Sequence, residues 1–159
     1  MARVPGMFFE DFEVGVVLAH EMRRTVTESD NVWFSAITMN PQPLHIDEEF
    51  SKGSMYKQRI VNSILTLGLV VGLTVAETTL GTTLGNLGFR EVRFPKPVFH
   101  GDTIRAETEV LQVRDSRSQP QAGIVTVRHR GFNQHDELVC ECERVFMMKR
   151  RLTPASPDA

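Results

Sequence analysis

The chain has 159 residues, 41% of them hydrophobic and 24% charged, a composition typical of a globular domain with one hydrophobic core. Lys and Arg number 18 and Asp and Glu number 20, so the net charge of −2 and the dispersed basic residues give no indication of a nucleic-acid partner. No apolar run reaches the roughly 20 residues that span a bilayer, and the first residues lack a signal-peptide pattern, so we expect a cytoplasmic protein with no membrane partner.

The N-terminal part of the chain predicts one strand and one helix. Residues 1–15 read as an irregular lead-in, and a strand is expected over 16–26. Thr27 then offers a capping hydroxyl, and Asp30 lies three positions later, as in a capping box. The predicted helix runs to about Thr38 and is expected to bury four apolar residues: Val32, Trp33, Ala36 and Ile37.

Two prolines end that helix. Pro41 and Pro43 disfavour helical geometry at the residues before them, which predicts a stiff, extended loop over 40–44. The loop delivers His45 to a fixed place, and a second short helix is expected over 48–51.

Residues 63–77 form a segment that is apolar on nearly every face and too short to cross a membrane. A helix of this kind belongs inside a protein, and it needs a sheet wrapped around it. Gly68 and Gly72 put small residues on one of its faces, which would allow a strand or another helix to approach closely.

The rest of the chain supplies that sheet. Strands are expected over 84–94, 103–114, 122–133 and 137–148, with the alternation of half-buried antiparallel strands. We therefore expect one α+β domain over residues 1–152, an antiparallel β-sheet wrapped around a central apolar helix, with a disordered tail over 153–159. Small sheets commonly complete their core by pairing with a second copy, so a homodimer or higher homo-oligomer is expected.

Cys140 and Cys142 are the only cysteines. Their spacing within a predicted strand is poor for a disulfide, and no second ligand pair suggests a zinc site. We expect free, buried or half-buried thiols in a reducing compartment and no metal site.

The motif MNPQPLHID at residues 39–47 carries most of the functional information. It resembles the MaoC-like, (R)-specific enoyl-CoA hydratase family, whose signature is Gly-Asp-x-Asn-Pro-x-His, often followed by x-Asp. Pro43, His45 and Asp47 match that pattern, and FPKPVFHGDTI at 94–104 is similar to the family's P-V-x-x-G-D-T turn. The resemblance covers roughly residues 10–150 and implies the hotdog fold.

Three positions depart from the family pattern. Asn40 stands at the catalytic aspartate, Gln42 at the asparagine, and Ser63 at a glycine whose backbone N–H binds the thioester oxygen. A backbone donor survives at Ser63, at the start of the central helix. The resemblance then implies that Asn40, His45 and Ser63 are catalytic. An amide cannot act as a base, so Asn40 would orient water, and His45 would be the single general base and acid.

Four further residues are candidates for substrate binding. Gln42 and Asp47 flank the histidine, although the short helix is expected to turn Asp47 away. Arg90 and Arg93 lie in the strand after the central helix. Either arginine could pair with a carboxylate of the acyl group or with a CoA phosphate. The alternative is that both are charged residues on the solvent-exposed side of the strand.

The remaining histidines lack such a motif. His20, His129 and His135 are expected to be structural or exposed, and His100 is expected to be a turn residue beside Gly101, which supplies positive φ.

These features predict reversible addition of water to an α,β-unsaturated acyl-CoA, giving a 3-hydroxyacyl-CoA, with a short branched or dicarboxylic acyl group such as mesaconyl as one option. No metal or redox cofactor is expected, because coenzyme A is part of the substrate. Two alternatives stay open. The first is an acyl-CoA thioesterase, against which residues 64–76 contain no Asp or Glu. The second is a non-catalytic acyl-thioester binding subunit, suggested by Asn40.

Overall fold

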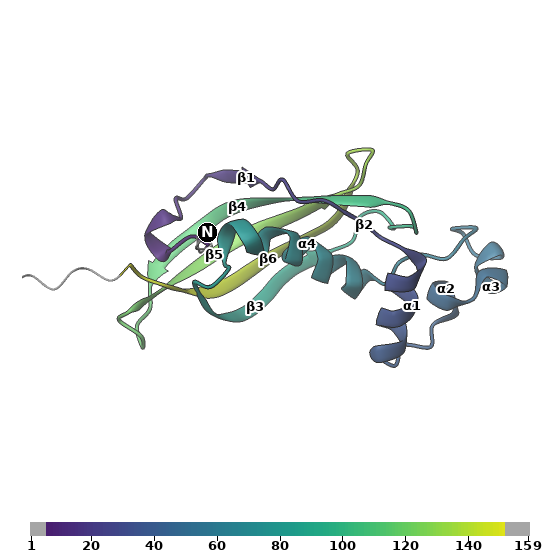
Figure 1. Cartoon of the computed structure of the whole chain (residues 1–159), viewed down its shortest axis with the longest axis horizontal. Helices are drawn as coiled ribbons and strands as arrows, with labels where there is room; N and C mark the ends of the chain where they lie inside the picture. The colour runs from purple at the N-terminus through teal and green to yellow at the C-terminus, as the bar shows by residue number, and fades with distance from the viewer. Residues whose placement is uncertain (1–5, 152–159) are drawn as a thin grey trace, which may run out of the picture.

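An antiparallel sheet with a helix lying across it forms the body of the protein in the computed structural model, which describes residues 6–151 (Figure 1). The strand order is β1-β4-β5-β6-β3, and β2 pairs with β4. The strands are β1 (Val17–Ala19), β2 (Arg24–Thr25), β3 (Thr83–Arg93), β4 (Thr103–Asp115), β5 (Ala122–Phe132) and β6 (Leu138–Lys149). This confirms the predicted α+β hotdog architecture and the four long strands. The predicted tail, residues 153–159, lies outside the described residues.

The predicted central helix is α4 (Ser63–Thr78), and it buries only one face against the sheet. Val70 packs so closely over β5 that a Cβ on Gly131 would come within 2.3 Å of its methyl carbon. The prediction that α4 is enclosed on every face is wrong, because Ile64 is 58% exposed. Gly68 and Gly72 lie on this open face, and no other segment among residues 6–151 comes within 4 Å of their Cβ positions. The close approach predicted for them occurs at Gly131 instead.

Helix α1 (Glu28–Ile37) has the predicted cap, with the Thr27 side chain accepting the backbone N–H of Asp30. The prediction that the apolar residues of α1 are buried is wrong. Trp33 and Ile37 are 70% and 72% exposed, and Val32 and Ala36 are exposed as well. The buried residues are Asn31 and Ser35, one helical turn apart. The polar face of α1 therefore points into the protein, and its apolar face has no cover within residues 6–151.

Two other local predictions are corrected. The strand expected over 16–26 is two short strands, β1 and β2, which both pair with β4. Between them the backbone N–H of Glu21 bonds the carboxylate of Glu77 at 3.1 Å instead of a neighbouring strand. The extended loop expected over 40–44 gives way to a helix at Pro43, since α2 spans Pro43–Ile46 and proline's fixed φ suits the first helical position. The predicted helix after it is α3 (Glu48–Lys52), and a 3-10 turn, η1, covers Phe9–Asp11.

The cysteines are buried and free, as predicted, and burial raises the pKa of Cys140 to about 12 and that of Cys142 to about 11. Within residues 6–151, α4 and the other helices are all too short or too polar to cross a bilayer. Helices α1, α2 and α3 gather beyond one end of the sheet, next to the start of α4 (Figure 1). This arrangement brings the motif loop to the N-terminus of the central helix.

Candidate functional site

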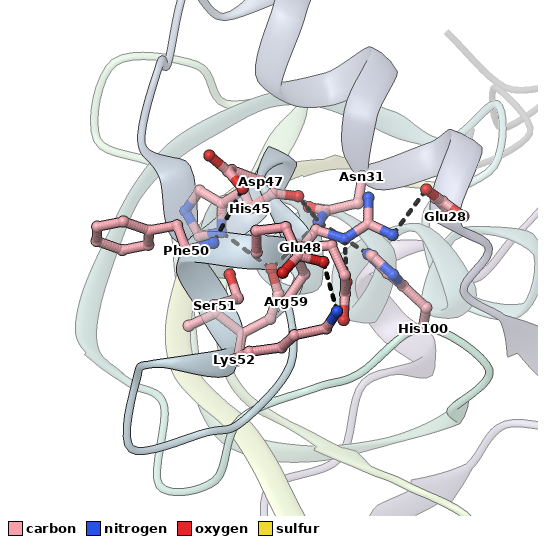
Figure 2. A network of polar contacts seen from close by, with 12 residues as sticks. Glu28, Asn31, His45, Asp47, Glu48, Phe50, Ser51, Lys52, Arg59 and His100 are labelled. Carbon is pink, nitrogen blue, oxygen red and sulfur yellow. Dashed lines mark hydrogen bonds and ion pairs between the residues drawn. The ribbon is translucent and has the colours of Figure 1, made fainter.

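His45 lies on α2 with 9% of its surface exposed (Figure 2). Its ring Nδ1 is 3.0 Å from the backbone carbonyl oxygen of Ile60. A carbonyl oxygen only accepts hydrogen bonds, so Nδ1 carries the hydrogen, and in the neutral ring Nε2 holds the lone pair. Within the described chain, no hydrogen bond is made to Nε2. The histidine is therefore held in the tautomer that can accept a proton at Nε2.

The first turn of α4 offers a backbone donor. Asn62 caps the helix, and its side-chain oxygen accepts the N–H of Ile64 at 3.0 Å. The N–H of Ser63 has no acceptor among residues 6–151. It lies at the positive end of the helix dipole, where a developing negative charge on oxygen is stabilised.

A cavity of about 250 Å³ lies against this turn. Its lining combines apolar groups with a few polar ones: Met55, Tyr56, Ile60, Val61, Ser63, Thr66, Phe94, Pro95, Lys96, Pro97, Val98 and Val139. The mixture suits a ligand with an apolar chain and an anionic or polar group.

Ile60 connects the histidine to this turn. Its carbonyl accepts from His45, and its N–H donates to the carbonyl of Leu44 at 3.0 Å. The next residue, Val61, donates to the carbonyl of Val98 at 2.8 Å. Ile60 precedes Ser63 by three residues, so the backbone segment 60–63 links the contact of His45 to the start of α4, and we call His45 together with this segment the frame. His45 itself is not among the residues that line the cavity beside Ser63.

Polar residues that the motif did not indicate surround this frame (Figure 2). Asn31 is fully buried and bonds the carbonyls of His45 and Ile60, both at 3.1 Å. Arg59 pairs with Glu28 and with Glu48, each at 2.7 Å, which joins α1 to α3 and lowers the pKa of Glu28. One signal was present in the sequence: Asn31 and Ser35 mark a polar stripe on α1, opposite the apolar residues that were assigned to the core.

His100 is more than the turn residue that was expected. Its Nε2 lies 3.0 Å from the side-chain nitrogen of Asn31. Burial, followed by the nearby charge of Arg59, lowers the pKa of His100, so its neutral form is favoured. Gly101 beside it has a φ of 95°, as the turn required.

The predicted residues of the motif loop have separate surroundings. The side-chain oxygen of Asn40 accepts the N–H of Gln42 at 3.1 Å, and Asn40 lines a second, largely apolar hollow with Met39 and Ile46. Gln42 is exposed. The carboxylate of Asp47 caps α3 by accepting the N–H of Phe50 at 2.9 Å. The structure thus joins His45 to the frame of Ser63, and it places Asn40 at a different hollow, which shares no lining residue with the Ser63 cavity.

The two predicted arginines lie on β3, away from the lining of the Ser63 cavity. Arg93 is exposed and pairs with Glu91 at 2.8 Å, and Arg90 is exposed opposite Glu143 of β6. The cation that does line the cavity is Lys96, whose side chain is 58% exposed and 4.0 Å from Glu137. Sequence reasoning missed Lys96, although it stands within the FPKPVF segment that was singled out.

A sheet wrapped over one helix, with a buried histidine and a free N–H at the helix start, defines a hotdog domain that holds a candidate proton acceptor and a candidate oxyanion donor. The sequence model of the MaoC like domain matches residues 11–132, and the chain belongs to that family.

Individual relatives agree with this assignment. The chain is 36% identical over 154 residues to a mesaconyl-CoA hydratase of Cereibacter sphaeroides, covering 97% of this chain and 44% of the relative. It is 32% identical to a beta-methylmalyl-CoA dehydratase of Chloroflexus aurantiacus, covering 92% and 41%. A MaoC-like dehydratase structure from Rhodospirillum rubrum superposes with a TM-score of 0.80 at 29% identity, covering 93% and 100%. The chain thus spans less than half the length of the two curated relatives.

Proposed function

We propose that this protein is a hydro-lyase that reversibly adds water to an α,β-unsaturated acyl-CoA and forms a 3-hydroxyacyl-CoA. One observation carries the proposal. The Ile60 carbonyl directs the hydrogen of His45 to Nδ1, which leaves a basic Nε2 on the frame that also holds the free N–H of Ser63. A base and an oxyanion donor are the two groups that this reaction needs most.

The chemistry follows from these two groups. His45 Nε2 takes a proton from water as the water oxygen bonds to C3 of the enoyl thioester. The C2–C3 π electrons form the enolate, and its negative oxygen is held by the N–H of Ser63. The His45 imidazolium then returns a proton to C2, so the histidine is restored and one water has been added. Asn40 is proposed to orient the water through its amide, as the resemblance implies.

A dicarboxylic acyl group is the proposed substrate class. Mesaconyl-CoA and beta-methylmalyl-CoA, which appear in the names of the two relatives, both carry a second carboxylate. Lys96 lines the cavity beside Ser63 and is the cation best placed to bind that carboxylate. Arg90 and Arg93 stay predicted contributors, through the carboxylate or the CoA phosphates. Gln42 and Asp47 remain candidates from the resemblance.

The full assembly is proposed to contain a second hotdog domain. The exposed apolar face of α1, including Trp33 and Ile37, is the surface that such a domain would cover. The curated relatives are more than twice as long as the part that this chain matches, which leaves room in each of them for a second domain of this size. A homodimer supplies the same arrangement here.

The reaction type is tested by offering the purified chain mesaconyl-CoA and crotonyl-CoA. Loss of the conjugated thioester absorbance and release of free thiol are followed together. The proposal expects loss of absorbance without thiol release, faster with mesaconyl-CoA. Thiol release would instead identify a thioesterase, and saturable binding with neither signal would identify a non-catalytic binding subunit.

A further inference from the structure

We propose that Asn31 is a positioning residue that fixes the histidine base, His45, relative to the oxyanion donor, the N–H of Ser63. The inference rests on the proposed function, and it concerns a side chain outside the signature motif. Asn31 lies on α1, is 0% exposed and makes hydrogen bonds to four separate parts of the site (Figure 2).

The orientation of the Asn31 amide is fixed by its partners. Its Oδ1 accepts the backbone N–H of Asn62 at 2.8 Å, so Nδ2 faces the other way. Nδ2 lies 3.1 Å from the carbonyl oxygens of both His45 and Ile60, and each of these oxygens only accepts. An amide offers an acceptor and two donors on one rigid plane, a combination that neither carboxylate nor hydroxyl provides.

His100 completes the arrangement. Its Nε2 lies 3.0 Å from Asn31 Nδ2, which has only hydrogens to give, so His100 Nε2 must accept. This requires a neutral His100 with its hydrogen on Nδ1, in agreement with its lowered pKa. The two hydrogens of Nδ2 are therefore shared among three acceptors that surround the site.

Three of the four partners matter directly for the proposed chemistry. One is the carbonyl of His45 itself, and another is the Ile60 carbonyl that directs the histidine tautomer. The third is the N–H of Asn62, the cap residue directly before Ser63. Asn31 thus bonds both halves of the frame and sets the distance between the base and the oxyanion donor. Misplacement of reacting groups by about 1 Å costs about 100-fold in rate.

The test compares two substitutions with a matched control. Asn31→Leu keeps the size and removes every hydrogen bond, whereas Asn31→Asp keeps the acceptor and loses the amide donors. Ser35→Ala is the control, because Ser35 is equally buried one turn later on α1 and its hydroxyl has no partner among residues 6–151.

The first readout needs no substrate. Imidazole ¹⁵N NMR, with His45 assigned through His45→Ala, reports the tautomer. We expect Nδ1–H in the wild type and in Ser35→Ala, and a population of the Nε2–H tautomer in Asn31→Leu. If the wild type hydrates no enoyl thioester, the proposed function fails, and this readout alone decides the role of Asn31.

The second readout is kinetic. Asn31→Leu is expected to lower kcat by about 10- to 100-fold, because misplacing reacting groups by up to about 1 Å has an effect of this size, while KM changes little. The buried carboxyl of Asn31→Asp must be protonated to face two carbonyl oxygens. The activity of this variant should therefore fall as pH rises, a decrease that the pH–rate profile of the wild type does not show.

Wild-type tautomer and wild-type kcat in both Asn31 variants would overturn the proposal. So would equal loss of kcat in Ser35→Ala. If Asn31→Leu fails to fold, Asn31→Asp carries the same comparison, and a loss that is parallel at every pH would assign Asn31 a purely structural role.

Discussion

At position 45, one backbone carbonyl determines which ring nitrogen of the histidine is basic. The contact between His45 Nδ1 and the oxygen of Ile60 directs the lone pair to Nε2. The neighbouring motif position holds Asn40, whose amide already accepts the N–H of Gln42. Since an amide takes no proton at neutral pH, His45 must carry both proton transfers in the proposed reaction.

We expect another buried histidine, His129, to make the stability of the fold depend on pH. His129 on β5 is 1% exposed, and burial lowers its pKa to about 3 from 6.5. The folded ring stays neutral while the unfolded chain binds a proton below pH 6.5, so the stabilisation is complete above that pH and is lost on acidification. Between pH 7 and 5 the loss amounts to about 2 kcal/mol.

Urea unfolding at the two pH values measures this effect. The decrease in unfolding free energy from pH 7 to pH 5 should be about 2 kcal/mol smaller in His129→Gln than in the wild type. His135→Gln, on the exposed turn between β5 and β6, should leave the decrease unchanged. An equal pH dependence in wild type and His129→Gln would show that His129 is not the group responsible.

At the scale of elements, the sequence predicted most of the fold because its signals are local. The Thr27 cap, the long apolar helix and the alternating strands all depend on neighbouring residues. The faces of the helices were predicted less well. Trp33 and Ile37 look like core residues in a periodic pattern, yet nothing among residues 6–151 covers their side of α1.

The candidate site could be predicted from the sequence only where a motif exists, and not where residues far apart in the chain meet. His45 and Ser63 follow from the motif and the helix start. Asn31 and Lys96 act through contacts between elements far apart in sequence, and a carbonyl such as that of Ile60 carries no side-chain signal at all. Only the folded chain brings these groups together.

The N-terminal cap of α4 is the element that supports the oxyanion donor. Asn62→Ala removes the bond to the N–H of Ile64 and should lower the unfolding free energy by about 1 kcal/mol. Gln42→Ala is the control, since Gln42 occupies the cap of α2 without a side-chain bond and should change stability little. Equal effects in urea unfolding would contradict the capping role.

At the scale of the molecule, the exposed apolar face of α1 predicts self-association. We expect light scattering to give twice the 18.0 kDa of one chain. Ile37→Asp places a charge on a surface that is 72% exposed in the single chain and should shift the protein to monomer. The fluorescence emission maximum of Trp33, the only tryptophan, should move to longer wavelength when the protein becomes monomeric.

The control is Val14→Asp, a similarly exposed apolar position (60%) in the turn before β1. It should leave the mass unchanged. A wild-type monomer, or a dimer that survives Ile37→Asp, would contradict the assignment of this face.

The most direct measurement of the central claim is the hydration rate of His45→Gln. Glutamine retains an amide that can donate to the Ile60 carbonyl, but it cannot accept a proton from water. We expect His45→Gln to fold and its hydration rate to fall by about 100- to 10,000-fold, the contribution of a general base. A folded His45→Gln that hydrates the substrate at the wild-type rate would contradict the central claim.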